Sequence, residues 1–207
     1  MPEENYRWLE REDILSFEEL SRIADLFLKL GVKRFRLTGG EPLLRRDLPT
    51  LIELLSNKPG LEDLSLTTNG ILLSEQAKAL KSAGLHRITL SLDTLNPTSF
   101  EQLTGRAQVD AALQGLEAAQ NAGFDSIKIN TVIIKGFNDL EIGNLLRFAQ
   151  NKGVTLRFIE YMDVGGATKW EESKVLSQQE LLTIIEQEFG HVLPIANRGS
   201  VPAQTYV

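Results

Sequence analysis

The sequence of 207 residues contains no cysteine. The chain can therefore form no disulfide and offers no thiolate to a zinc or iron–sulfur centre. It has only two histidines, His86 and His191, and neither stands at the carboxyl end of an expected strand. We interpret both as structural or solvated residues, so neither a zinc site nor a histidine-based catalytic triad is expected.

The chain also lacks any concentration of positive charge and any long apolar run. Its net charge is −6, and no basic stripe or arm is present, which argues against binding to nucleic acid or anionic membranes. No apolar stretch approaches the roughly 18 residues of a membrane span. The first six residues are polar and acidic, unlike a signal peptide. We expect a cytoplasmic protein with neither nucleic acid nor membrane as a partner.

What is present is the composition of an ordinary globular domain, with 42% hydrophobic and 24% charged residues. Strand and helix patterns alternate without a long linker, and repeated strand–helix units require right-handed crossovers and a parallel sheet. The sequence therefore predicts an α/β fold, a partial (β/α) barrel with parallel strands inside and helices outside. We assign residues 1–190 to this barrel and 191–207 to the start of a truncated C-terminal segment.

The expected strands cover residues 33–38, 62–67, 87–92, 126–133 and 154–159. Ser16 and Glu19 form a capping box that opens the first helix, and Gly31 ends it. A second capping box, Ser177 with Glu180, opens a helix over 178–189. Further helices are expected over 48–57, 74–83 and 109–122, and from Asn138 as N-cap to about residue 151.

Each expected strand alternates apolar and polar residues, unlike the continuous apolar strands of a parallel sheet covered on both faces. Because successive side chains point to opposite faces, the apolar set must face the helices and the polar set the other side. The polar set includes three cations, Arg36, Lys128 and Arg157. Three cations on one face suit an anionic ligand, most simply a phosphate-bearing one. Alternatively, these cations form a structural network with Glu41, Asp93 or Glu160.

Hydroxyls, amides and glycines follow the strands at their carboxyl ends, where α/β barrels and open sheets bind ligands. Gly39 and Gly40 come directly after a strand and let the backbone approach a ligand, and Glu41 adds a carboxylate. The run 67–70 (Thr-Thr-Asn-Gly) is interpreted first as a turn. Its position after a strand makes it a candidate ligand contact as well.

These segments, in this order, resemble the radical S-adenosylmethionine GTP 3′,8-cyclases that begin molybdenum cofactor biosynthesis. The runs that carry the resemblance are 38–48 (TGGEPLLRRDL), 66–70 (LTTNG), 91–93 (SLD), 128–130 (KIN), 135–139 (KGFND) and 157–165 (RFIEYMDVG). Gly-Gly-Glu-Pro alone marks only the superfamily, whereas the whole string is specific. The resemblance implies a lyase with a radical SAM partial barrel whose first strand is missing here. A homodimer is compatible with this resemblance.

The resemblance also implies two ligand sets. S-adenosylmethionine would contact Gly39, Gly40, Glu41, Ser91, Asn130, Arg157 and Met162, and GTP would contact Arg36, Thr67 and Lys128. The implied chemistry uses a [4Fe-4S] cluster to convert S-adenosylmethionine to a 5′-deoxyadenosyl radical. The radical takes the 3′ hydrogen of GTP, and the ribose carbon then attacks C8 of guanine to give 3′,8-cyclo-7,8-dihydro-GTP.

The sequence departs from this family at the cluster. In relatives a Cys-x3-Cys-x2-Cys loop lies immediately before a Met-Pro pair, and this chain begins with Met1-Pro2. The cysteines of the family's second cluster would lie beyond Val207. We therefore expect this polypeptide to bind no cluster and to have no turnover by itself.

Three other interpretations stay open. The chain could belong to a radical SAM enzyme with another substrate, or it could be a non-catalytic remnant that binds only nucleotide or S-adenosylmethionine. It could also be a phosphate-binding barrel enzyme that works by acid–base chemistry. That enzyme would need a paired carboxylate or a histidine base at the strand ends, where only Glu41, Asp93 and Glu160 are available.

Overall fold

The computed structural model describes residues 13–163, 170–196 and 203–207. The Met1-Pro2 pair, Val164, Gly165 and Pro202 lie outside the described residues. Five parallel strands form one sheet in the order β1-β2-β3-β4-β5. They are Arg34–Leu37, Asp63–Thr68, Arg87–Ser91, Ile127–Ile133 and Thr155–Glu160. The structure thus confirms the predicted α/β fold and its parallel sheet.

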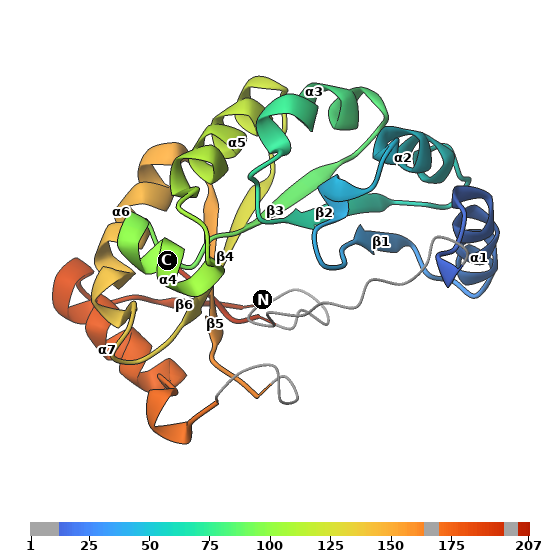
Figure 1. Cartoon of the computed structure of the whole chain (residues 1–207). Coiled ribbons are helices and arrows are strands. Elements are labelled where there is room, and N and C mark those ends of the chain that lie inside the picture. The colour runs from blue at the N-terminus through green and yellow to red at the C-terminus, as the bar shows by residue number, and fades with distance from the viewer. Residues whose placement is uncertain (1–12, 164–169, 197–202) are drawn as a thin grey trace.

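Helices cover one side of this sheet. The α-helices of the described chain are α1 (Phe17–Lys29), α2 (Leu48–Ser56), α3 (Leu73–Ser82), α4 (Pro97–Thr104), α5 (Val109–Asn121), α6 (Ile142–Lys152) and α7 (Gln178–Phe189). Figure 1 shows α1, α2, α3, α5 and α6 as an arc outside the strands. The strands do not close into a ring, because β1 and β5 are the two edges of the sheet. The architecture is a partial barrel.

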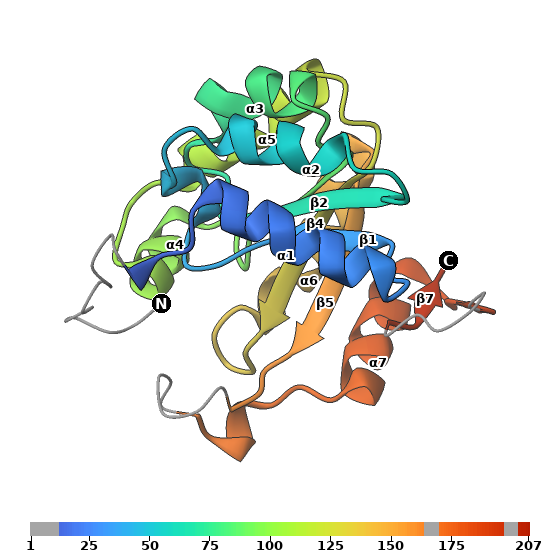
Figure 2. The same cartoon turned by 90° about the vertical axis from the view of Figure 1, so that its right-hand side faces the viewer.

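Short elements complete the described chain. Three 3₁₀ helices, η2 (Pro42–Leu44), η3 (Asp139–Glu141) and η4 (Glu172–Lys174), lie in connections between the larger elements. The strands β6 (Pro194–Ile195) and β7 (Thr205–Tyr206) pair antiparallel. Figure 2 shows α1 beside β1 at one edge of the sheet, with α7 and β7 on the side of β5.

The helix ends test the local predictions. Both capping boxes are present, with Ser16 and Glu19 at α1 and Ser177 and Glu180 at α7. The prediction for Asn138 is wrong, because its side chain caps no helix. Its amide is instead buried and donates to the carbonyl of Asp93, two residues after β3, and to the carbonyl of Val132 in β4. Helix α4 was not predicted, because its eight residues are too few to show a clear helical period.

The core lies between the sheet and the helices. Leu64 and Leu66 of β2 are fully buried, and they belong to one cluster with Ile52 of α2 and Leu116 of α5. Burying a side chain of this kind contributes about 1.5–3 kcal/mol. Because the apolar residues of each strand are used in this way, the alternate residues line the face without helices. We call this second surface the polar face.

Candidate functional site

Four neighbouring cations on the polar face form a group that we call the cation cluster. They are Arg36 of β1, Arg87 of β3, Lys128 of β4 and Arg157 of β5. The strand register brings them close: Arg36 and Arg87 both pair with Ser65, Thr89 pairs with Lys128, and Asn130 pairs with Arg157. The predicted cations Arg36, Lys128 and Arg157 are therefore gathered on one face of the sheet.

The cations of the cluster are close enough to lower one another's pKa values. Burial lowers the pKa of Lys128, and the positive charges of Arg157, Arg87 and Arg36 lower this pKa further. Burial also lowers the pKa of Arg157, with Arg36 and Arg87 as additional causes. Like charges at short range destabilise one another unless an anion is present. The cation cluster thus favours a negatively charged ligand.

Only one member of the cation cluster has a carboxylate partner within the part of the chain that the structure describes. Arg87 donates from Nε to Asp63 Oδ1 at 2.6 Å and from Nη2 to Asp63 Oδ2. This hydrogen bond lowers the pKa of Asp63. Arg36, Lys128 and Arg157 form no ion pair there. The alternative network with Glu41, Asp93 or Glu160 is therefore not observed among the described residues.

Among the described residues, two neutral polar atoms on the same face are buried without a hydrogen-bond partner. They are Thr67 Oγ1 of β2 and Asn130 Oδ1 of β4. Leaving such an atom unsatisfied costs about 1–3 kcal/mol. Thr67 shares a row with Thr89 and Lys128, and Asn130 shares the next row with Arg157. Their positions beside the cation cluster indicate a site that a ligand with donors completes.

The glycine turn after β1 lies at the carboxyl edge of the sheet. Gly39 has a φ of 156°, which residues with a side chain rarely adopt. A Cβ added at Gly39 or Gly40 would meet no atom within 4 Å. Packing against the described residues therefore does not require glycine at either position. We call the open backbone of Gly39 and Gly40 the glycine cradle. A ligand can approach this backbone closely.

Glu41 holds this turn against the end of β2. Its Oε1 accepts hydrogen bonds from Leu43 N at 3.1 Å and Thr68 Oγ1 at 2.7 Å, and its Oε2 accepts from Asn69 N at 2.8 Å. The carboxylate is therefore used by the chain itself. In this structure Glu41 positions the cradle, and direct contact with a ligand stays a prediction.

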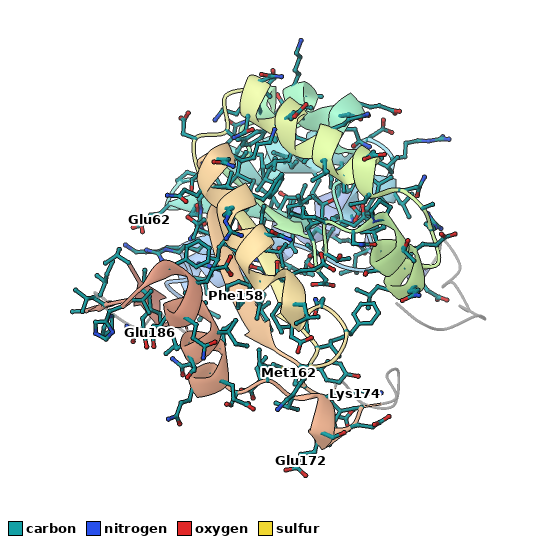
Figure 3. The ribbon with its side chains drawn as sticks, turned by 90° about the vertical axis from the view of Figure 1, so that its left-hand side faces the viewer. Glu62, Phe158, Met162, Glu172, Lys174 and Glu186 are labelled. Carbon is teal, nitrogen blue, oxygen red and sulfur yellow. The ribbon has the colours of Figure 1, made fainter. Side chains whose placement is uncertain are left out.

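The remaining predicted contacts lie at the ends of β3 and β5. Ser91 is the last residue of β3, is exposed, and pairs in register with Asn130. Met162 follows β5 and is 56% exposed. In Figure 3 Met162 lies beyond the end of β5, whereas Phe158 lies near α6 and α7. The structure thus places Met162 at the carboxyl edge of the sheet.

Sequence reasoning missed Arg87 and the burial of Asp93. Arg87 shares the alternation of Thr89 and Ser91, so the same parity rule would have placed it on the polar face. Asp93 was considered as a partner for the cations and as a candidate acid–base carboxylate, but its burial was not predicted. Burial raises the pKa of Asp93, although a hydrogen bond from Val132 N to its Oδ1 at 2.7 Å opposes this. Only the fold could show that burial.

No group of three or more metal-binding side chains occurs among residues 13–163, 170–196 and 203–207. Over those same ranges, every helix is too short or too polar to cross a membrane.

The sequence model of the radical SAM superfamily matches residues 3–149. The chain belongs to this superfamily. Solved radical SAM structures share the fold. Superposition on anSMEcpe with bound AdoMet gives a TM-score of 0.65 at 21% identity, over 87% of this chain and 52% of that one. Streptococcus suis SuiB bound to S-adenosylmethionine gives 0.63 at 21% identity, over 75% and 36% of the two chains.

Similar sequences within the superfamily carry one enzyme name. GTP 3′,8-cyclase 3 of Mycobacterium bovis is 47% identical over the whole of this chain and 56% of its own length. GTP 3′,8-cyclase of Aquifex aeolicus is 48% identical over 91% of this chain and 59% of its own length. The chain therefore spans little more than half the length of these curated relatives.

The superfamily implies S-adenosylmethionine and an iron–sulfur cluster. The residues of this chain suit the first of these groups but not the second. The open glycine cradle and the unsatisfied Asn130 Oδ1 fit the polar groups of S-adenosylmethionine. The cluster does not fit, because its irons need thiolate ligands and the sequence has no cysteine.

Proposed function

We propose that this chain is the GTP- and S-adenosylmethionine-binding portion of a GTP 3′,8-cyclase, a lyase of molybdenum cofactor biosynthesis. The observation that carries the proposal is 45–47% identity to enzymes of that name over the whole chain. The cation cluster supports it independently, because GTP is strongly anionic and these cations lack enough carboxylate partners. We assign residues 1–190 to the barrel and 191–207 to a following segment.

The residues divide between two ligands. Arg36 and Lys128 hold the phosphates of GTP, since charge-assisted hydrogen bonds to phosphate are strong. The hydroxyl of Thr67 lies in the same row as Lys128 and bonds to GTP too. Because binding fixes the ribose and the guanine of one GTP molecule relative to each other, the chain favours bond formation between C3′ and C8 by positioning.

The second ligand occupies the carboxyl edge of the sheet. The backbone of Gly39 and Gly40, held by Glu41, takes the methionyl end of S-adenosylmethionine. Ser91, Asn130, Arg157 and Met162 contact the rest of it. When bound, this cofactor supplies the group that abstracts hydrogen from the substrate.

The chain alone is proposed to be inactive. It provides no thiolate for a cluster, so no step through a cluster is assigned to its residues. A homodimer and a cytoplasmic location remain predictions. A radical SAM enzyme with a different substrate is the main alternative, and it would bind GTP no better than other nucleotides.

Calorimetric titration of the chain with GTP tests the proposal. We expect Lys128→Ala to weaken GTP binding at least about tenfold, because a hydrogen bond to a charged group contributes about 1.5–3 kcal/mol. Lys152→Ala is the matched control, since Lys152 pairs with Glu117 at 2.7 Å between α5 and α6. Equal GTP affinity of Lys128→Ala and the wild-type chain would contradict the proposal.

A further inference from the structure

Strands β3 and β4 are joined first by backbone pairing and then, beyond the last paired residues, by hydrogen bonds that involve side chains. Register pairing runs to Ser91 with Asn130, and Leu92 N still donates to Asn130 O at 3.0 Å. Beyond this point side chains connect the two segments. Thr131 Oγ1 donates to Leu92 O at 2.7 Å, and Val132 N donates to the Asp93 carboxylate at 2.7 Å.

Asn138 completes this connection. Its Nδ2 donates to Asp93 O at 2.7 Å and to Val132 O at 2.9 Å. Its Oδ1 accepts from Ile134 N at 2.7 Å, and the residue has no exposed surface. A primary amide provides two donors and an acceptor, which neither a carboxylate nor an aliphatic side chain can do. The site therefore specifically suits asparagine.

The connected segments carry candidate ligand contacts. Ser91 lies two residues before Asp93, and Asn130 lies two residues before Val132 on β4. Asn138 donates to the carbonyls of Asp93 and Val132. Arg36 and Lys128 lie farther from this edge and are held by regular backbone pairing. Loss of the Asn138 amide would therefore disturb the edge of the sheet more than the cation cluster.

We propose that Asn138 is a positioning residue for the adenosyl ligand: it fixes the ends of β3 and β4 and so aligns Ser91 and Asn130. This role deepens the proposed function and depends on it. It also predicts that the two ligands respond differently to substitution at residue 138. A residue that merely stabilised the fold would affect both ligands alike.

The test uses the whole chain, with S-adenosylhomocysteine and GTP as separate probes. We expect Asn138→Ala to weaken S-adenosylhomocysteine binding at least tenfold and to change GTP binding less than twofold. Asn138→Asp, which is nearly isosteric and preserves the acceptor, is the second variant should the first fail to fold. It should show the same split between the ligands, because it cannot donate to the two carbonyls.

Asn96→Ala is the matched control. Asn96 caps α4 by accepting from Thr98 N and Ser99 N, and it is exposed. Its loss should lower the melting temperature and leave both affinities unchanged. Variants at 138 that bind S-adenosylhomocysteine like the wild type, or lose both ligands equally, would overturn the positioning role alone. A wild-type chain that binds neither probe would overturn the proposed function, and this role with it.

Discussion

At the scale of single residues, the candidate site contains polar and charged groups that are buried without enough compensating interactions. Lys128 is half-buried near three other cations, and burial with their charge lowers its pKa. Asn130 Oδ1 is buried without a partner. Burial raises the pKa of Asp93. Groups of this kind concentrate where proteins bind ligands, because the ligand supplies the missing interactions.

Asp93 gives a pH-dependent prediction. Its pKa in the folded chain is above its unfolded value of 3.8, so its contribution to stability is complete below that value and is lost as pH rises through the folded pKa. Asp93→Asn cannot ionise and keeps an acceptor for Val132 N. We expect it to melt at a higher temperature than the wild type at pH 7, with the difference shrinking toward pH 3.8.

Thermal melts between pH 4 and pH 8 measure this difference. Asp125→Asn, at an exposed aspartate outside the site, is the control and should show no comparable change. The interpretation fails if Asp93→Asn gains no stability at pH 7 relative to pH 4.

At the scale of elements, helix α5 supports the turn that follows β2. A Cβ on Gly115 would lie 2.2 Å from Gly70 O, so only glycine allows this close approach. Gly70 N in turn donates a hydrogen bond to Thr68 Oγ1 at 3.0 Å. Thr68 also donates to Glu41, which holds the glycine cradle. The packing of α5 is thus connected to the cradle through successive contacts.

Gly115→Ala should therefore destabilise the fold. We expect a loss of about 1–3 kcal/mol from overpacking, because the obstructing atom is backbone and alanine's helix propensity gains only about 1 kcal/mol. Urea unfolding measures the change. Gly143→Ala is the matched helix control, since the three atoms nearest its Cβ would belong to the carboxylate group of the flexible Glu188 side chain and not to backbone. A Gly115→Ala chain as stable as the wild type would refute the close contact.

The sequence allowed prediction of the elements better than of their contacts. Alternation along each strand was enough to place Arg36, Lys128 and Arg157 on one face, because parity depends only on neighbouring residues. The bonds from Thr68 to Glu41 and from Asn138 to Asp93 join residues 27 and 45 positions apart. No local pattern specifies such pairs. Asn138 was taken for a helix cap because asparagine commonly caps helices.

At the scale of the whole molecule, charge is distributed unevenly. The sequence carries a net charge of −6, whereas the polar face gathers the four cations of the cation cluster, of which Arg87 alone has a carboxylate partner, Asp63, among the described residues. A local positive field within an acidic protein attracts anionic ligands to one surface. The fold therefore directs an anionic ligand to the open side of the partial barrel.

The central claim is that the polar face binds the phosphates of a nucleotide. A crystal structure of the chain grown with saturating GTP tests it most directly. We predict phosphate oxygens within hydrogen-bond distance of Lys128 Nζ and the Arg36 guanidinium. Phosphates bound on the helix side of the sheet, or a polar face without nucleotide, would contradict the claim.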